Sequence, residues 1–336
     1  MIGNKLLRLL NCHNEHAQQI DDPMSADHVE QIPSKARTSR DLQEAASVAF
    51  LGPSGTYSEE AVIKVFGDTA VRIGCASISD VFGAVAASVA LSGVVPFENS
   101  AQGPVAETLD LLADTGLPAT SEVVMPIVHC MLPNARELPK IDCVLGHSQA
   151  LAQCRKWLDR HLPGVERRAV SSNAAAVKAA SESDTFGAPA GERTGRLYGV
   201  EILCRAIQDE PSNSTRFLIV GGVPKLASGE GRTLIRVEIE HCAGSLVHML
   251  EPLEMHGISI EFFEMRPLGA CPWSYYFFLE LAGYPHVHPL THALHEMAHR
   301  TVSLMVLGSY ASTRVLKRAG SGATGTGKRG TRENSR

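Results

Sequence analysis

The sequence predicts an α/β fold followed by a smaller module with the order strand–helix–strand–strand–helix–strand. Between residues 47 and 226, short apolar runs alternate with amphipathic helical segments, which is typical of α/β folds with largely parallel sheets. Between residues 232 and 311 the order of elements becomes βαββαβ. That order is typical of a ferredoxin-like module.

The 336 residues suffice for two or three domains, and a hydrophobic content of 44% suffices for their cores. Residues 1–46 carry no sustained apolar period, and residues 319–336 are rich in glycine, serine, threonine and charge. We expect both of these segments to be disordered. The two regions of alternating elements are therefore the two folded parts.

Composition excludes several classes of protein. No apolar run approaches membrane-spanning length and no secretory signal is evident. The net charge is −5 and no dense basic patch is present, so nucleic acid is not an expected partner. The eight cysteines show no CxxC pair and no zinc-ligand spacing, which favours free, mostly buried thiols in the cytoplasm.

The clearest helix of the first region is predicted over residues 103–115. Leu109 and Leu112 lie on one stripe, Pro104 falls in the predicted first turn, and Gly116 is the stop signal. The helix lies between two predicted strands, as the α/β pattern requires.

The second region opens with the strand RTLIRVEIE, whose alternation of apolar and charged residues predicts one solvated face. The next helix carries Leu246, Leu250 and Leu253 on one side and ends at Gly257. Two strands, a helix over residues 289–299 and a last strand complete the module.

Polar side chains gather at the starts of helices in the first region, and a threonine–arginine pair, Thr215 and Arg216, precedes a strand. The plain interpretation is a set of helix caps, but their number favours a ligand cleft. Helix N-termini offer unpaired N–H groups to carboxylates, and ligands gather at the carboxyl ends of strands in such folds. The pattern predicts a site for a small polyanionic molecule. The stretch GPSGTYS does not fit the G-x-G-x-x-G fingerprint of a dinucleotide site.

Several stretches resemble the prephenate dehydratase family in order and spacing: FLGPSGTYSEEA, GVVPFENS, SSNAAAVKAA, IQDEPSNSTRFLIVG and GSLVHMLEP with FFEMRPLGACPWSYYFFLELAG. The resemblance covers about residues 47–311. It implies a two-lobed catalytic region like a type II periplasmic binding protein, with lobes of roughly 47–123 with 205–226, and 124–204. It also implies that residues 232–311 form an ACT regulatory domain.

The family resemblance implies a lyase that converts prephenate to phenylpyruvate in L-phenylalanine biosynthesis, with loss of water and carbon dioxide. Aromatisation drives this reaction, so no cofactor or metal is expected; a dry cleft must fix the substrate and direct a donor at the departing oxygen. Two alternatives stay open: an arogenate dehydratase, and a ligand sensor without activity. A fused chorismate mutase is not expected, because the 46-residue leader is short and aperiodic.

The resemblance also implies roles for residues. Thr215 would hydrogen-bond the leaving oxygen, Arg216 would orient the loop or pair with a carboxylate, and Phe217 would wall the ring. Glu98 would donate a proton or, as we prefer, brace its loop. The implied substrate contacts are Thr56, Tyr57, Ser58, Asn99, Ser100, Ser172 and Asn173. Three stretches depart from the family pattern: Asn173 replaces a threonine, Gln102 and Pro104 replace a Glu-Gly-Ser run, and residues 187–194 replace a small-residue stretch.

For the second region the resemblance implies a phenylalanine site across a dimer interface, in a homodimer or homotetramer. The implied binding residues are Gly244, Ser245, Leu246, Val247, Glu264, Met265, Arg266 and Pro267. Ala243 and Met265 depart from the family pattern, which leaves the affinity for L-phenylalanine and the sign of regulation open.

One feature lies outside the family motifs. His288, His292, His295 and His299 fall on one side of the predicted helix 289–299, opposite its leucines. Spacings of three and four would permit a divalent metal to bridge two imidazoles, but we interpret the stripe as a solvated polar face and predict no metal.

Overall fold

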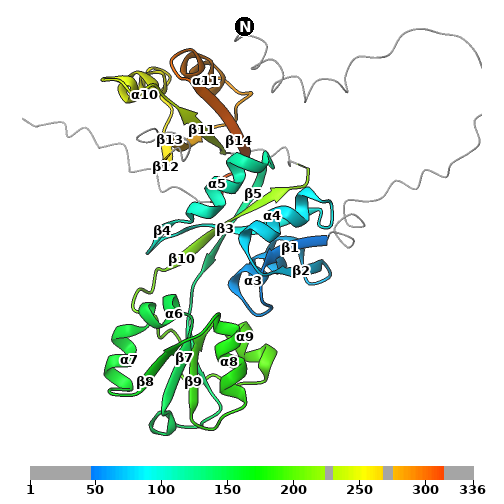
Figure 1. The fold of residues 1–336 in the computed structure, drawn as a ribbon, viewed down its shortest axis with the longest axis vertical. Coiled ribbons are helices and arrows are strands. Elements are labelled where there is room, and N and C mark those ends of the chain that lie inside the picture. The colour runs from blue at the N-terminus through cyan, green and yellow to red at the C-terminus, as the bar shows by residue number, and fades with distance from the viewer. Residues whose placement is uncertain (1–46, 224–229, 268–274, 314–336) are drawn as a thin grey trace, which may run out of the picture. The chain divides into compact units, whose positions relative to one another are not determined.

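The computed structural model describes residues 47–223, 230–267 and 275–313 (Figure 1). The disorder expected of residues 1–46 and 319–336 lies outside the described residues.

The first lobe is built on five strands in the order β5-β10-β3-β1-β2. β1 is parallel to β2 and β3, whereas β10 is antiparallel to both β3 and β5. The strands are β1 (Ser47–Leu51), β2 (Val71–Cys75), β3 (Ser92–Asn99), β5 (Ala119–Pro126) and β10 (Ser214–Gly221). The helices are α3 (Tyr57–Phe66), α4 (Ile78–Ala86) and α5 (Ala106–Thr115).

Local signals explain the helix boundaries of this lobe. The Thr56 side chain caps α3 and Ser77 forms a capping box on α4. Gly116 ends α5 in the left-handed conformation, as predicted. The predicted start of that helix at residue 103 is wrong, because Gly103–Pro104 forms the short strand β4 against β3. Proline has no N–H to donate and is tolerated at such an edge.

The second lobe holds a separate sheet in the order β6-β9-β7-β8 (Figure 1, green). Its strands are β6 (Cys130–Pro133), β7 (Cys143–Gly146), β8 (Glu166–Ala169) and β9 (Phe186–Ala190). Its helices are η1 (Leu138–Lys140), α6 (Ser148–Gln153), α7 (Arg155–His161), α8 (Asn173–Ser181) and α9 (Glu192–Tyr198).

Two chain segments, 127–129 and 199–213, connect the lobes. They lie side by side, since the Ile127 N–H donates to the Asn213 carbonyl and the Ile207 N–H to the His129 carbonyl, each at 2.9 Å. An inserted lobe on two adjacent connections confirms the expected two-lobed α/β architecture.

The carboxy-terminal module has the predicted βαββαβ order and a sheet order of β12-β13-β11-β14. Its elements are β11 (Gly231–Glu238), α10 (Ser245–Met255), β12 (Ile260–Pro267), β13 (Tyr275–Ala282), α11 (Leu290–His299) and β14 (Ser303–Ala311). The ferredoxin-like prediction is confirmed.

The module's sheet continues into that of the first lobe, because β14 pairs with β5 where Gly308 faces Ala119. A Cβ on Gly308 would lie 2.2 Å from the Ala119 carbonyl oxygen. Only glycine therefore allows the two strands to approach so closely.

The predicted solvated face of β11 is wrong for the first half of the strand. Arg232 and Leu234 are buried. Leu234 and Phe278 of the module belong to the same core cluster as Phe97 and Leu109 of the first lobe. The face is buried because it packs against the first lobe, a contact that alternation within one strand cannot reveal.

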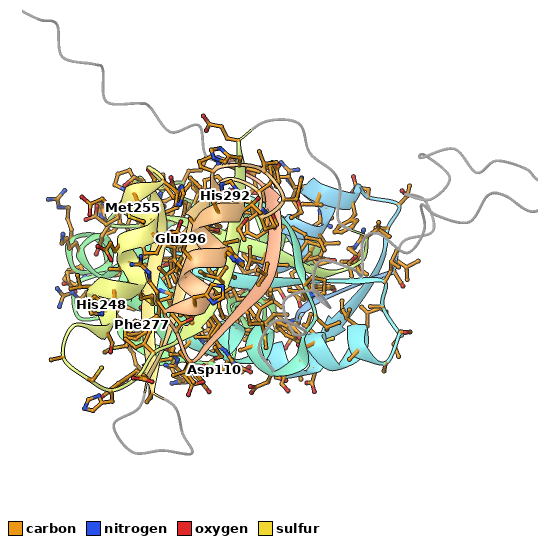
Figure 2. All side chains as sticks on the ribbon, turned by 90° about the horizontal axis from the view of Figure 1, so that it is seen from above. Asp110, His248, Met255, Phe277, His292 and Glu296 are labelled. Carbon is orange, nitrogen blue, oxygen red and sulfur yellow. The ribbon has the colours of Figure 1, made fainter. Side chains whose placement is uncertain are left out.

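The helices of the module cover its other face. In α10 the buried side includes Met249 and Leu253, whereas Leu246, which we expected there, is 39% exposed. In α11 the leucines are buried and the histidine stripe is exposed, as predicted. His292 and Glu296, labelled in Figure 2, both lie on this helix.

Within the described residues, no helix combines the length and apolarity that crossing a bilayer demands.

Candidate active site

Thr215 lies at the start of β10, paired in register with Asn99 of β3 and Met125 of β5. The Asn99 side chain, 6% exposed, ends its strand. Its Nδ2 donates to Thr215 Oγ1 at 2.9 Å and to Asn213 Oδ1 at 3.0 Å. Strand pairing thus brings together two residues predicted from separate loops.

The orientation of the Asn99 amide is fixed by the backbone. Its Oδ1 accepts hydrogen bonds from the N–H groups of Ala101 at 3.0 Å and Gln102 at 3.2 Å. Because backbone N–H groups only donate, the NH₂ end must face Thr215. Thr215 Oγ1 is then an acceptor from Asn99, and its own hydroxyl hydrogen is left to donate to another group.

Ser100 and Asn213 complete this group, which we call the Thr215 cluster (Thr215, Asn99, Ser100 and Asn213). The Ser214 N–H donates to Ser100 Oγ at 2.9 Å, and Ser100 Oγ donates to Asn213 Oδ1 at 3.5 Å. Asn213 is 3% exposed. Sequence reasoning missed it, although it stands two residues before Thr215; only the strand register shows that it meets Asn99.

At the start of α3, the three predicted substrate contacts differ in surroundings. The Thr56 side chain accepts a hydrogen bond from the Glu59 N–H. The Tyr57 hydroxyl donates to the Val128 carbonyl at 2.7 Å, between the lobes, and burial raises the pKa of Tyr57. Ser58 is buried. Thr56 and Tyr57 therefore already have protein partners.

The loop before α3 is tied to the second lobe. Glu59, 6% exposed, accepts a hydrogen bond from the Gly55 N–H at 2.7 Å and pairs with Arg72 at 3.2 Å and Arg193 at 3.6 Å. The Thr194 hydroxyl donates to the Gly55 carbonyl at 2.6 Å. Two residues of the stretch that departs from the family pattern thus position this loop.

The loop before α8 joins the Thr215 cluster through a chain of hydrogen bonds. Ser172 caps α8, and Asn173 Oδ1 accepts from the His147 N–H at 3.0 Å. The His147 ring accepts from the Gln149 N–H at 3.3 Å, and the Gln149 side chain donates to that of Gln102.

Because the Gln102 N–H donates to Asn99, the chain runs from Thr215 to Asn173. These contacts therefore link the Thr215 cluster of the first lobe to the Ser172–Asn173 loop of the second lobe. The two departures Gln102 and Asn173 are both members of this chain.

Arg216 and Phe217 lie beneath the cluster. Phe217, 3% exposed, packs in a core cluster with Val48 and Val62. Arg216 is 2% exposed and pairs with Glu98 at 3.2 Å. Their contact with substrate stays a prediction, and so do the roles of the other site residues.

Arg216 stays charged although it is buried. Burial by itself lowers the pKa of Arg216, but Glu280, Tyr310 and Glu122 raise it above its ordinary value.

The carboxy-terminal module contains a cavity of about 200 Å³. Of the predicted regulatory residues, Gly244, Leu246 and Val247 line it. Ser245 is buried beside them, with its hydroxyl 2.8 Å from the Cys242 sulfur. The other lining residues are Ile239, Glu240, His241, Cys242, Tyr275 and Phe277.

The second predicted regulatory stretch, Glu264–Pro267, lies on β12, which is at one end of the sheet order, and is not part of the cavity lining. Met265 is 51% exposed. Arg266 pairs instead with Asp110 of α5, at 2.5 Å between Nη2 and Oδ2. The two predicted stretches do not meet within one chain.

In the part of the chain that the structure describes, no group of three or more histidine, cysteine or acidic side chains is arranged to hold a metal ion. The exposed pair His295 and His299 have their Nε2 atoms 3.3 Å apart.

Comparison with known proteins matches residues 48–225 to the family model described as prephenate dehydratase. The bifunctional chorismate mutase/prephenate dehydratase of Neisseria gonorrhoeae is 41% identical over 272 residues, 80% of this chain and 75% of that protein. The protein of the same description from Pseudomonas aeruginosa is 40% identical over 271 residues, which cover 80% of this chain and 74% of that protein. Among solved structures, the prephenate dehydratase of Arthrobacter aurescens in complex with L-Phe is 30% identical. Its TM-score is 0.73, and the match covers 79% of this chain and 90% of that one.

Proposed function

The chain belongs to the prephenate dehydratase family, whose members are hydro-lyases, and on that premise we propose how its residues act on prephenate. Residues 47–226 are the catalytic domain, with lobes of roughly 47–123 with 205–226, and 124–204. Residues 232–311 are an ACT regulatory domain. The observation that carries the catalytic proposal is the hydroxyl of Thr215, held as an acceptor by Asn99 and left with its hydrogen to donate.

The reaction needs one donated proton and no redox partner. The bond between the ring and its carboxylate breaks and carbon dioxide leaves; that electron pair aromatises the ring as the carbon–hydroxyl bond breaks. Prephenate dianion and one proton give phenylpyruvate anion, carbon dioxide and water. The hydroxyl group departs most easily when a donor is already aimed at its oxygen.

In our proposal, Thr215 directs its hydroxyl hydrogen at the departing oxygen. The proton that turns the departing hydroxyl into water is delivered as the carbon–oxygen bond breaks, or through a relay of groups. A threonine hydroxyl is a weak acid, so its contribution is a positioned hydrogen bond. Asn99 fixes the direction of that bond; Asn213 accepts a hydrogen bond from Asn99, and Ser100 donates one to Asn213. Glu98, paired with Arg216, braces the strand.

The substrate carboxylates are held at helix N-termini of the two lobes. The first N–H groups of any α-helix have no partner within the helix, and the caps Thr56 and Ser172 each satisfy one of them. The remaining first-turn groups of α3 and α8 are the proposed carboxylate sites, where the helix dipole favours negative charge. Asn173 positions the α8 loop.

L-phenylalanine is the proposed effector, at the module cavity lined by Gly244, Leu246 and Val247. The Arthrobacter relative, solved with L-Phe, supports this proposal. Exposed apolar side chains lie on α10, at the cavity, and on β12, notably Val247 at 68% and Met265 at 51%. A second copy of the chain would cover them and bring its β12 to the cavity, so we propose a homodimer or a dimer of dimers.

We also place the protein in the cytoplasm. Support comes from the described cysteines, which are free thiols, with Cys130, Cys143 and Cys154 buried.

The test of the function is direct. Purified protein is given prephenate or arogenate in parallel, and phenylpyruvate and phenylalanine are quantified. We expect phenylpyruvate from prephenate at the higher kcat/KM, and inhibition when L-phenylalanine is added. Failure to turn over either substrate would favour the sensor, and preference for arogenate would revise the substrate.

A further inference from the structure

A buried group of charges lies on the face of β10 opposite Thr215. We call it the Arg216 cluster; its members are Arg216, Glu98, Glu122, Arg232, Glu280 and Tyr310. Arg216 Nη1 contacts both oxygens of Glu280, at 2.6 and 2.7 Å, and Glu122 at 3.1 Å. Its guanidinium lies 4.5 Å above the Phe97 ring.

The carboxy-terminal module supplies half of this cluster. Glu280 is on β13, and it also accepts hydrogen bonds from the Tyr310 hydroxyl of β14 at 2.5 Å and from Arg232 of β11 at 3.1 Å. Glu280 itself has no exposed surface. The side chain directly beside Thr215 in the chain is therefore held by a carboxylate from another domain.

The charges of the cluster's interior balance. The side chains of Glu122 and Glu280 are 0% exposed, and they face the two arginines. Glu98 lies at the edge of the cluster and is 24% exposed, whereas Glu261, outside the cluster, is 12% exposed. Because a buried charge without its partner is strongly unfavourable, the Arg216 guanidinium has one stable position, the one that Glu280 defines.

The strand itself is irregular at this point. The pairing of β10 with β3 shifts register between Arg216 and Phe217, next to the residue that carries the hydroxyl. Such bulges re-aim side chains and disrupt the ladder locally, while the start of β10 keeps its register with β5. On the β3 side, the start of β10 is therefore held by side chains as well as by the ladder, and Arg216 is its charged anchor.

We propose that Glu280 of the carboxy-terminal module is a positioning residue for the dehydratase reaction. It fixes Arg216, and Arg216 fixes the start of β10, which aims the Thr215 hydroxyl. The inference rests on the proposed function. It makes the module part of the catalytic machinery even when no effector is bound.

The test is steady-state kinetics of the full-length Glu280→Gln variant with prephenate. The change keeps the shape of the side chain and removes its charge. We expect kcat to fall by about 10- to 100-fold with little change in KM, because a small misplacement of a catalytic group lowers the rate of the chemical step. A purely electrostatic effect would instead lower KM, since removing a negative charge favours binding of a dianion.

The matched control is Glu261→Gln. Glu261 is also a carboxylate of the module, and it pairs with Arg232 at 3.6 Å and not with Arg216. We expect wild-type kcat from this variant. If wild-type protein forms phenylpyruvate and Glu280→Gln keeps wild-type kcat, the positioning role is wrong while the proposed function stands. Wild-type protein that forms no phenylpyruvate would refute the proposed function itself.

A second variant separates positioning from stability, in case Glu280→Gln folds poorly. Arg216→Met combined with Glu280→Met removes both partners, so the thermal stability lost in either single variant should be regained. Positioning predicts that kcat stays low in this double variant. Recovery of wild-type kcat together with stability would show that the pair serves only the fold.

Discussion

The two faces of β10 differ in charge, although Thr215 and Arg216, which mark them, are neighbours in the chain. On the face of Thr215, amides and hydroxyls form a neutral group next to the connection between the lobes. On the face of Arg216, carboxylates and arginines form a sealed, charged group against the carboxy-terminal module. The neutral face can donate a hydrogen bond without presenting an ionised group that would need solvation by water. The charged face is suited to holding the strand in place.

This difference predicts two kinds of mutant. Changes on the charged face should act first on stability, because breaking a buried ion pair leaves a charge without compensation. Removal of the Thr215 hydroxyl on the neutral face should act mainly on turnover. Comparing free energies of unfolding with kcat for the same variants therefore tests whether the faces have separate roles.

The largest effect is expected for Arg216→Met. It leaves Glu122 and Glu280 buried without their main partner, so the free energy of unfolding should fall by about 3–5 kcal/mol. Urea unfolding followed by circular dichroism measures this. A loss below about 1 kcal/mol would show that Arg232 alone neutralises both carboxylates.

Next is Thr215→Val, which keeps the shape of the side chain and removes its hydroxyl. We expect kcat to fall by about 100- to 1,000-fold, the effect of removing one positioned donor, while the unfolding midpoint changes little. Thr215→Ser serves as the control and should keep most of the activity. Near-normal turnover by the folded valine variant would rule out the catalytic role.

Asn213→Ala should have a smaller effect. It removes the buried acceptor of Asn99 and should lower the free energy of unfolding by about 1–3 kcal/mol. A further decrease in kcat is expected, because the Asn99 amide loses one of its supports. The control is Asn134→Ala, whose amide makes an exposed bond to Asp184 and should change stability by less than about 0.5 kcal/mol. Equal effects from the two variants would contradict the structural role of Asn213.

The smallest effect is expected for Arg266→Ala. Its pair with Asp110 also joins the carboxy-terminal module to the first lobe, but the side chains are 29% and 41% exposed. Water screens such a pair, so thermal unfolding in low salt should report a loss below about 1 kcal/mol. A loss as large as that of Arg216→Met would show that contact between domains, and not burial of charge, determines the effect.

The sequence predicted what depends on local pattern. The strand–helix order, the βαββαβ module, the polar residues at the starts of α3 and α8 and the stop at Gly116 are all local signals, and the structure has them. What it could not predict depends on register between distant segments. Asn213 meets Asn99 across paired strands, and no periodicity indicates that partner.

The errors concern contacts that local pattern does not reveal. β11 alternates as if one face were solvated, yet Leu234 packs with residues of the first lobe. Pro104 fits the first turn of a helix, yet the chain there pairs with Glu98 as a short strand. The role of Arg216 in binding substrate stays a prediction, and its buried partner Glu280 belongs to the carboxy-terminal module, a contact that the local sequence does not indicate. The contacts of Leu234 and Arg216 form only when elements far apart in sequence meet, whereas β4 pairs with β3, its neighbour in the chain.

The most direct measurement is a crystal structure of the Thr215→Val variant soaked with prephenate. The account predicts the ring hydroxyl of the substrate within hydrogen-bonding reach of the lost threonine oxygen. Its carboxylates should lie at the first turns of α3 and α8, with no atom of the Arg216 cluster in contact. Prephenate bound away from residue 215, or a carboxylate paired with Arg216, would contradict the account.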